Sequence, residues 1–234
     1  MALILSIDTA TAICSVSIGK DGQLLCKKEL LSSPNAHSSS LTLLIDSLLK
    51  DTGLSSFEID AFAISQGPGS YTGLRIGTSV AKGLCYATDK PLIAIDTLQA
   101  MASAVQKRIG YENIHPSALL VPMIDARRME VYTSQYDRQL QQLIPVLPQI
   151  ISEISFLEEL QNIVYFFGDG SAKCKSSIVH KNAIFIDNIH TSSENMVALA
   201  ELLFQEDNFV DVAYYEPFYL KEFQATTPKS NILH

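Results

Sequence analysis

The hydrophobic pattern of the first hundred residues changes its period near residue 38. Before that point, short apolar runs alternate with polar turns, which is typical of strands in an antiparallel meander. After it, apolar side chains recur every three or four positions in two stretches, which predicts helices at residues 38–53 and 71–87. The predicted strands are residues 3–7, 13–18, 24–31, 59–65 and 92–95. A meander followed by alternating helices and strands predicts the α/β class, with mixed sheets under helical cover.

The second half of the chain partly repeats this opening pattern. Asp8 and Asp125 each end an apolar strand and begin a polar turn, and the next turn aspartate follows 13 positions later in the first case and 12 in the second. This repetition predicts a duplicated meander. The chain is therefore expected to form two related domains, residues 1–104 and 105–221.

Two capping-box patterns predict later helices. Ser155 is followed three positions later by Glu158, and Thr191 by Glu194, so a helix is expected to begin at each. The second of these helices could pack back on the first domain. Residues 222–234 are polar and aperiodic, which predicts a loosely ordered tail.

Composition and charge limit the functions that fit. The chain is 47% apolar, yet no apolar run approaches the roughly 20 residues of a membrane-spanning helix, so we expect a globular cytoplasmic protein with no membrane contact. Its formal charge of −8 opposes a large nucleic-acid footprint of its own. Basic residues form only short pairs, each predicted to be a solvated surface pair: Lys27/Lys28, Lys107/Arg108 and Arg127/Arg128.

Two turns could face a nucleotide phosphate. Asp8 lies in a tight turn after a buried strand, although the same pattern also fits an ordinary Asx-turn. Residues 65–77 form a glycine-rich loop before a helix, where free amides and the helix dipole can bind an anion. The loop lacks the lysine of a Walker A motif. The candidate nucleotide-binding residues are Asp8, Thr9, Gly67, Gly69 and Ser70.

The helix after this loop has small residues on one face. Gly73, Gly77 and Ala81 are spaced by four and therefore share a side of the helix, which lets another element approach closely. That side could meet a partner or the protein's own sheet. The charged segment of residues 125–130 is predicted to be an exposed hairpin whose charges neutralise one another.

Three motifs resemble the TsaB family, formerly YeaZ. They are the opening Ile-Asp-Thr-Ala, the run from Ser65 to Gly77 with Ala-Lys-Gly at 81–83, and Ile-Asp-Ala-Arg-Arg-x-Glu-Val-Tyr at 124–132. The closing Pro217-x-Tyr219-Leu220 and the total length resemble it as well. The resemblance implies a two-domain fold like that of actin, hexokinase and Hsp70, which is ribonuclease H-like and would account for the duplicated meander.

The resemblance also implies a role and partners. The family's members support TsaD, the subunit that transfers threonylcarbamoyl to adenosine in tRNA, in a complex that also contains the ATPase TsaE. It implies that tRNA is held mainly by the partners, that no cofactor is bound tightly although ATP or ADP could lie at the interface of the complex, and that the chain alone forms a homodimer. The implied contact is a four-helix one. The residues assigned to this interface are Leu43, Ser47, Tyr71, Gly73, Leu74, Gly77, Thr78 and Ala81.

One departure separates this chain from the catalytic subunit. TsaD carries a His-x-x-x-His metal motif after its next strand, and the equivalent segment here begins with Thr97 and ends with Met101, neither of which supplies an imidazole ligand. No catalytic residue and no metal site are therefore predicted. Two alternatives stay open, a sugar-kinase-like or Hsp70-like phosphotransferase that uses Asp8, and a homodimeric interaction protein.

Overall fold

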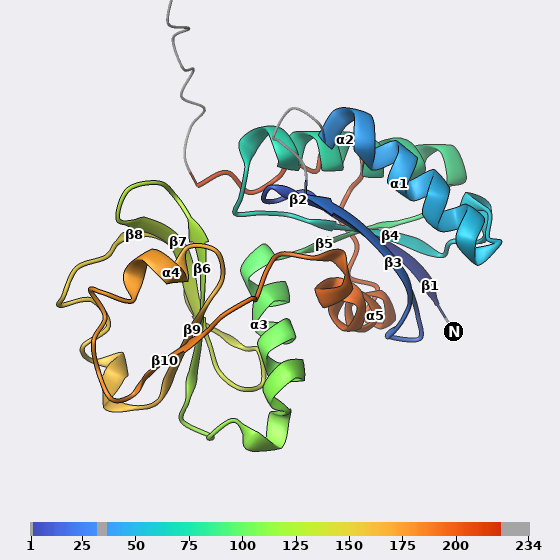
Figure 1. Ribbon diagram of the computed structural model, residues 1–234. Helices are drawn as coiled ribbons and strands as arrows, with labels where there is room; N and C mark the ends of the chain where they lie inside the picture. The colour runs from blue at the N-terminus through green and yellow to red at the C-terminus, as the bar shows by residue number, and fades with distance from the viewer. Residues whose placement is uncertain (1, 32–36, 221–234) are drawn as a thin grey trace, which may run out of the picture.

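Two five-stranded sheets form the framework of the molecule. The structure, a computed structural model, describes residues 2–31 and 37–220 (Figure 1). The predicted tail, residues 222–234, lies outside the described residues. The first sheet has the order β3 (Gln23–Leu31), β2 (Ile13–Lys20), β1 (Leu3–Asp8), β4 (Ala61–Ser65) and β5 (Leu92–Ile95). The second has the order β8 (Gln142–Ile150), β7 (Glu130–Tyr136), β6 (Leu119–Asp125), β9 (Val164–Phe167) and β10 (Ala183–Ile186).

The two sheets share one plan. In each, the first three strands along the chain pair antiparallel, and the two later strands add in parallel beyond the first. Asp8 ends β1 and Asp125 ends β6, so the two aspartates occupy equivalent places. The predicted duplication of the meander is confirmed.

Helices cover both faces of each sheet. Helices α1 (His37–Thr52) and α2 (Tyr71–Thr88) lie side by side on one face of the first sheet, and α5 (Val197–Gln205) lies beneath the other (Figure 1). The pleat of β1 explains this division, because Leu5 and Ile7 point into the core under α1 and α2 while Ile4 points into the core with α5. Helices α3 (Thr97–Ile109) and α4 (Ser171–Cys174) pack on opposite faces of the second sheet.

Helix α3 connects the two halves. Asp96 caps it by accepting the backbone N–H groups of Leu98 and Gln99 at 2.8 and 2.9 Å, and the same Oδ1 accepts the hydroxyl of Tyr136 on β7 at 3.0 Å. The side chains of α3 pack with Leu120 and other residues of the second sheet. The boundary predicted between residues 104 and 105 falls inside this helix.

Two helix starts are predicted wrongly. At Ser155 the chain makes turns and a short 3₁₀ helix (Glu159–Gln161), because Phe156 is buried with a φ of +65°, a left-handed conformation that no helix interior accepts. Near Thr191 the helical part begins only with a 3₁₀ turn (Ser193–Met196), and the Thr191 hydroxyl bonds Thr11 at 2.6 Å instead of capping. The remaining 3₁₀ helices are Ser56–Glu58 and Tyr111–Asn113.

The small-residue face of α2 points inward. Gly73 and Gly77 lie against Thr9 in the turn after β1, where a Cβ on Gly77 would clash with the Thr9 Oγ1 and lie 3.0 Å from the Cδ1 of Ile64. Ala81 is fully buried in the same core. Gly73, Gly77 and Ala81 do not face outward, because the glycines form the contact between α2 and its own sheet. Leu74 and Thr78 are buried as well, so the predicted exposure of these residues at an interface is wrong.

Substitution of Gly77 therefore tests this packing. Gly77→Ala should lower the free energy of unfolding by about 1–3 kcal/mol, because the added methyl overpacks the contact with Thr9. Gly83→Ala, in the same helix with no atom within 4 Å of the new Cβ, should raise it by up to about 1 kcal/mol. Urea denaturation of both variants measures the sign of each change in the free energy of unfolding. Equal changes at the two positions would contradict the inward placement of Gly77.

Candidate functional site

Asp8 lies in a closed, fully buried environment. Its Oδ1 accepts the backbone N–H of Ala10 at 3.0 Å, which is the Asx-turn geometry, and the hydroxyl of Ser65 at 3.0 Å. Its Oδ2 is buried with no partner among the described residues. Desolvation raises the pKa of Asp8 from 3.8 to about 6, and the two hydrogen bonds offset only part of that rise.

The glycine-rich loop is also covered by the chain itself. Gly67 has a φ of +113°, donates its N–H to the Thr97 hydroxyl at 3.1 Å, and accepts the Thr97 N–H at 3.0 Å. The C-terminal segment runs over this loop, where the Phe218 N–H donates to the carbonyl of Gln66 at 2.8 Å. A Cβ at Gly67 would lie 2.6 Å from the Phe218 carbonyl oxygen, so only glycine allows this crossing.

The N-terminus of α2 is occupied by backbone carbonyls. Ser70 donates its N–H to the Ala10 carbonyl at 2.6 Å and caps the helix by accepting the Gly73 N–H at 3.2 Å. The Thr9 hydroxyl donates to the Gly73 carbonyl at 2.8 Å, and Gly69 packs directly on Ala10. The structure thus brings the predicted nucleotide-binding residues together. The Ala10 carbonyl oxygen of the β1–β2 turn takes the Ser70 N–H, at the end of the helix where an anion would approach.

The equivalent turn of the second sheet has an ion pair of its own. The Asp125 carboxylate pairs with Lys173 of α4, whose Nζ also donates to the carbonyl of Glu130 at 2.7 Å. Asp169 accepts the Asp125 N–H at 3.1 Å, and burial raises the pKa of Asp169. The hairpin does not neutralise Asp125 as predicted, because a lysine from another element does so.

Thr97 and Met101 have packing roles. Both are buried; Thr97 bonds the glycine-rich loop, and the Met101 Cε approaches Gly168 at the end of β9. Within residues 2–31 and 37–220, no group of three or more His, Cys, Asp or Glu side chains could hold a metal ion. None of the helices described there is long and apolar enough to cross a membrane.

The exposed side of α1 and α2 has a second row of small residues. Ser79, Gly83 and Ala87 are exposed and spaced by four, on the side of α2 away from the sheet. Leu43 on α1 is 68% exposed and Tyr86 on α2 is 91% exposed. Of the predicted interface residues, Leu43 lies fully on this surface, while Ser47 and Tyr71 are half-buried and Tyr71 contacts the ring of Tyr219.

A buried hydroxyl network was not predicted. Ser15 on β2 bonds Ser193 by hydroxyl–hydroxyl contact at 2.8 Å and by the Ser193 N–H at 3.1 Å, and Thr11 bonds Thr191 nearby. The partners lie almost 180 residues apart, so no local pattern could have indicated them. The network holds the segment before α5 against the first sheet.

The buried carboxylate predicts a pH-dependent stability difference. Because the folded pKa of about 6 exceeds 3.8, the folded state keeps a proton in this interval that the unfolded chain has released. The contribution of Asp8 to the free energy of unfolding is therefore largest at low pH and is lost as the pH rises toward 6. Asp8→Asn keeps an oxygen acceptor for Ala10 and Ser65, so it should be more stable than wild type at pH 7, by up to about 3 kcal/mol.

The advantage of Asp8→Asn should shrink to nothing below about pH 4, where both proteins are neutral at this position. Urea denaturation of both proteins from about pH 4 to 7.5 measures the difference, because other buried carboxyls cancel in the comparison. A difference that stays constant over this range would contradict the raised pKa.

Comparison with known proteins identifies relatives over almost the whole chain. A family model described as TsaD, tRNA N6-adenosine threonylcarbamoyltransferase, matches residues 32–229. The tRNA threonylcarbamoyladenosine biosynthesis protein TsaB of Haemophilus influenzae is 32% identical, over 93% of both chains. TsaB of Escherichia coli is 31% identical, over 93% of this chain and 94% of its own.

Solved structures agree on the fold. YeaZ from Pseudomonas aeruginosa superposes with a TM-score of 0.79 at 24% identity, over 94% of this chain and 100% of that one. A polyphosphate/ATP-glucomannokinase from Arthrobacter sp. strain KM gives a TM-score of 0.51 at 11% identity, over 88% and 100%. The predicted actin- and hexokinase-like fold is confirmed. With this coverage and identity, the chain belongs to the TsaB family of tRNA threonylcarbamoyladenosine biosynthesis proteins.

Proposed function

We propose that this chain is a non-catalytic subunit that binds a TsaD-type transferase and supports the transfer of threonylcarbamoyl to adenosine in tRNA. The observation that carries the proposal is the exposed side of α1 and α2, which has a row of small residues on α2 and the exposed apolar side chains of Leu43 on α1 and Tyr86 on α2.

Gly83 is the residue on the exposed side of α2 that most favours an interface there. A glycine inside a helix costs roughly 1 kcal/mol relative to alanine. Gly69, Gly73 and Gly77 are explained by close contacts within the chain, whereas a Cβ on Gly83 would meet nothing within 4 Å. The distance between packed helices depends on the side chains at the contact, so Ser79, Gly83 and Ala87 let a partner helix approach closely.

The closed loop supports a non-catalytic role. A phosphotransferase needs open amides for phosphate and an accessible carboxylate for a metal or base. Here the Ala10 carbonyl occupies the start of α2 and Asp8 is buried. ATP or ADP would accordingly bind at the interface of the complex, with no cofactor held tightly by this chain.

The remaining partners follow from the same role. TsaE would join the complex, and tRNA would be held mainly by the partner subunits, because this chain carries a charge of −8. The complex would act in the cytoplasm. In the absence of TsaD, the surface of α1 and α2 would meet its own copy and form a homodimer, so the two assemblies would compete.

Gly83→Leu tests the interface without disturbing the fold. The new side chain enters open space, so the melting temperature should stay within a few degrees of wild type or rise. Binding to TsaD should fall by at least about tenfold, because leucine holds the two helix backbones apart. Isothermal titration measures the binding, and size exclusion reports the homodimer.

Ala198→Leu is the matched control. Ala198 is an exposed helical residue on α5, on the other side of the first sheet, so its substitution adds comparable bulk and should leave TsaD binding unchanged. If Gly83→Leu binds TsaD as tightly as wild type does, the interface lies elsewhere and the proposal fails.

A further inference from the structure

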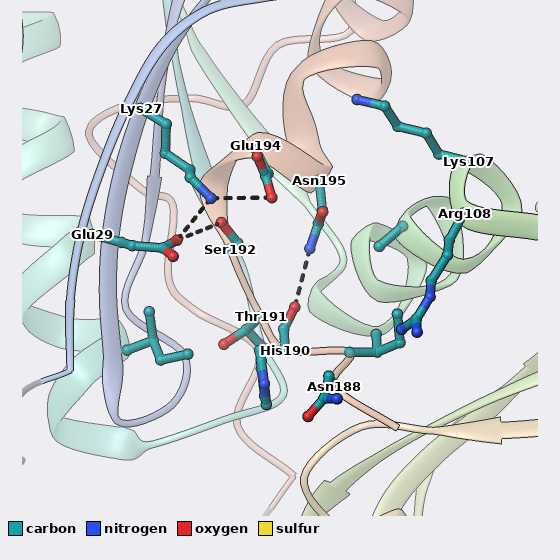
Figure 2. A pocket seen from close by; sticks show the side chains of 13 residues that line it. Lys27, Glu29, Lys107, Arg108, Asn188, His190, Thr191, Ser192, Glu194 and Asn195 are labelled. Atoms are coloured by element: carbon teal, nitrogen blue, oxygen red, sulfur yellow. Dashed lines mark hydrogen bonds and ion pairs between the residues drawn. The ribbon is translucent and has the colours of Figure 1, made fainter. Parts of the chain in front are cut away.

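A cavity lies where the first sheet, α3 and the segment before α5 meet. It has a volume of about 460 Å³, which is within the usual range for small-molecule sites. Its walls are Ile13 and the outer strand β3, the last turns of α3, and residues 188–195 (Figure 2). Neither Asp8 nor the glycine-rich loop lines it, so the cavity is separate from the site described above.

The fold gathers three residues from two of the scattered basic pairs around this cavity. Lys27 comes from β3, whereas Lys107 and Arg108 come from the last turn of α3, about 80 positions later. Figure 2 shows Lys107 and Arg108 on one side of the cavity and Lys27 on the other. The lining thus contains three cationic side chains and two carboxylates, Glu29 and Glu194.

The carboxylates of the lining are already paired. Lys27 Nζ lies 3.1 Å from a carboxylate oxygen of Glu29 and 3.1 Å from one of Glu194, and Ser192 donates its hydroxyl to Glu29 at 3.2 Å. These contacts hold both acidic groups at the Lys27 side. They leave the opposite wall basic.

Lys107 and Arg108 are available to a ligand. Arg108 donates one Nη1–H to the Asp187 carbonyl at 2.7 Å, which fixes its guanidinium and leaves further donors for another acceptor. The Lys107 ammonium has no partner among the described residues. Figure 2 shows their end groups pointing apart, so the wall offers two separate cationic groups, a planar fork and a point charge, each of a kind that binds phosphate and carboxylate oxygens.

The rest of the lining suits the body of a small organic molecule. Ile13, Ala104 and Ile189 supply apolar contact, and the side chains of Asn188 and His190 supply polar groups. The adjoining wall is rigid, because Thr191 and Ser192 are buried and Thr191 bonds Thr11. A site needs such fixed walls so that little ordering free energy is lost on binding.

We infer that this cavity binds a small molecule with a phosphate or carboxylate group, at the wall to which Lys107 and Arg108 belong. A small molecule is favoured over RNA because the basic groups line a hollow and the surrounding protein is acidic. Such a ligand would contact elements of the first sheet and α3 at once. Its binding would therefore stabilise the arrangement of the two halves.

Binding of defined probes to the full chain tests the inference. Pyrophosphate and AMP represent phosphate ligands, citrate represents carboxylate ligands, and a short single-stranded RNA represents a nucleic acid. At least one small probe should bind wild type with a Kd below about 1 mM in isothermal titration. The double variant Lys107→Gln/Arg108→Gln should bind that probe at least about tenfold more weakly.

A charge-matched control separates site binding from general attraction. Lys20→Gln/Lys181→Gln removes two exposed charges that do not line the cavity, and it should bind the probe as wild type does. Binding is the readout because Lys107 and Arg108 also stabilise the end of α3 through its dipole, so melting alone would be ambiguous.

Three outcomes would overturn the inference. They are no binding of any small probe at about 10 mM, equal loss in both double variants, or binding of the RNA alone.

Discussion

The close approach of α2 to the turn after β1 is the contact on which the rest of the structure depends. Gly69, Gly73 and Gly77 lie where a side chain would collide with Thr9 or Ala10, so the helix lies directly on backbone. This contact ties two segments 64 positions apart through the Thr9–Gly73 hydrogen bond. It also fixes which side of α2 faces out.

Two properties of the molecule follow from that one contact. The carbonyl of Ala10 takes the amide that a helix N-terminus would otherwise offer to an anion, so the contact closes the loop. The same rotation of the helix places Ser79, Gly83 and Ala87 outside. The bond between the Ala10 carbonyl and the Ser70 N–H and the outward position of that row thus have a single cause.

The sequence predicted the framework well and the facing of α2 poorly, for a physical reason. Strand and helix periods are local, so the duplicated meander could be read from the apolar pattern and from the places of Asp8 and Asp125. Rows of small residues spaced by four occur on both sides of α2, and spacing alone has no preference between them. Only the contact with Thr9, which is distant in sequence, selects the inner row. The failed helix at Ser155 has a similar origin, because burial of Phe156 outweighs a good cap.

The basic residues around the cavity also could not be grouped from local sequence patterns. Lys27 and Lys107 each looked like solvated surface residues, because each belongs to a short basic pair and nothing local connects the two pairs. The hydroxyl pairs Ser15–Ser193 and Thr11–Thr191 hold the segment before α5 against the first sheet, while the end of α3 forms the other wall. The position of the wall formed by the segment before α5 therefore depends on these buried hydroxyl groups together with the ion pair of Lys27 with Glu194. A substitution in that network would change the cavity without touching its cations, which makes the network the structural determinant of any ligand bound there.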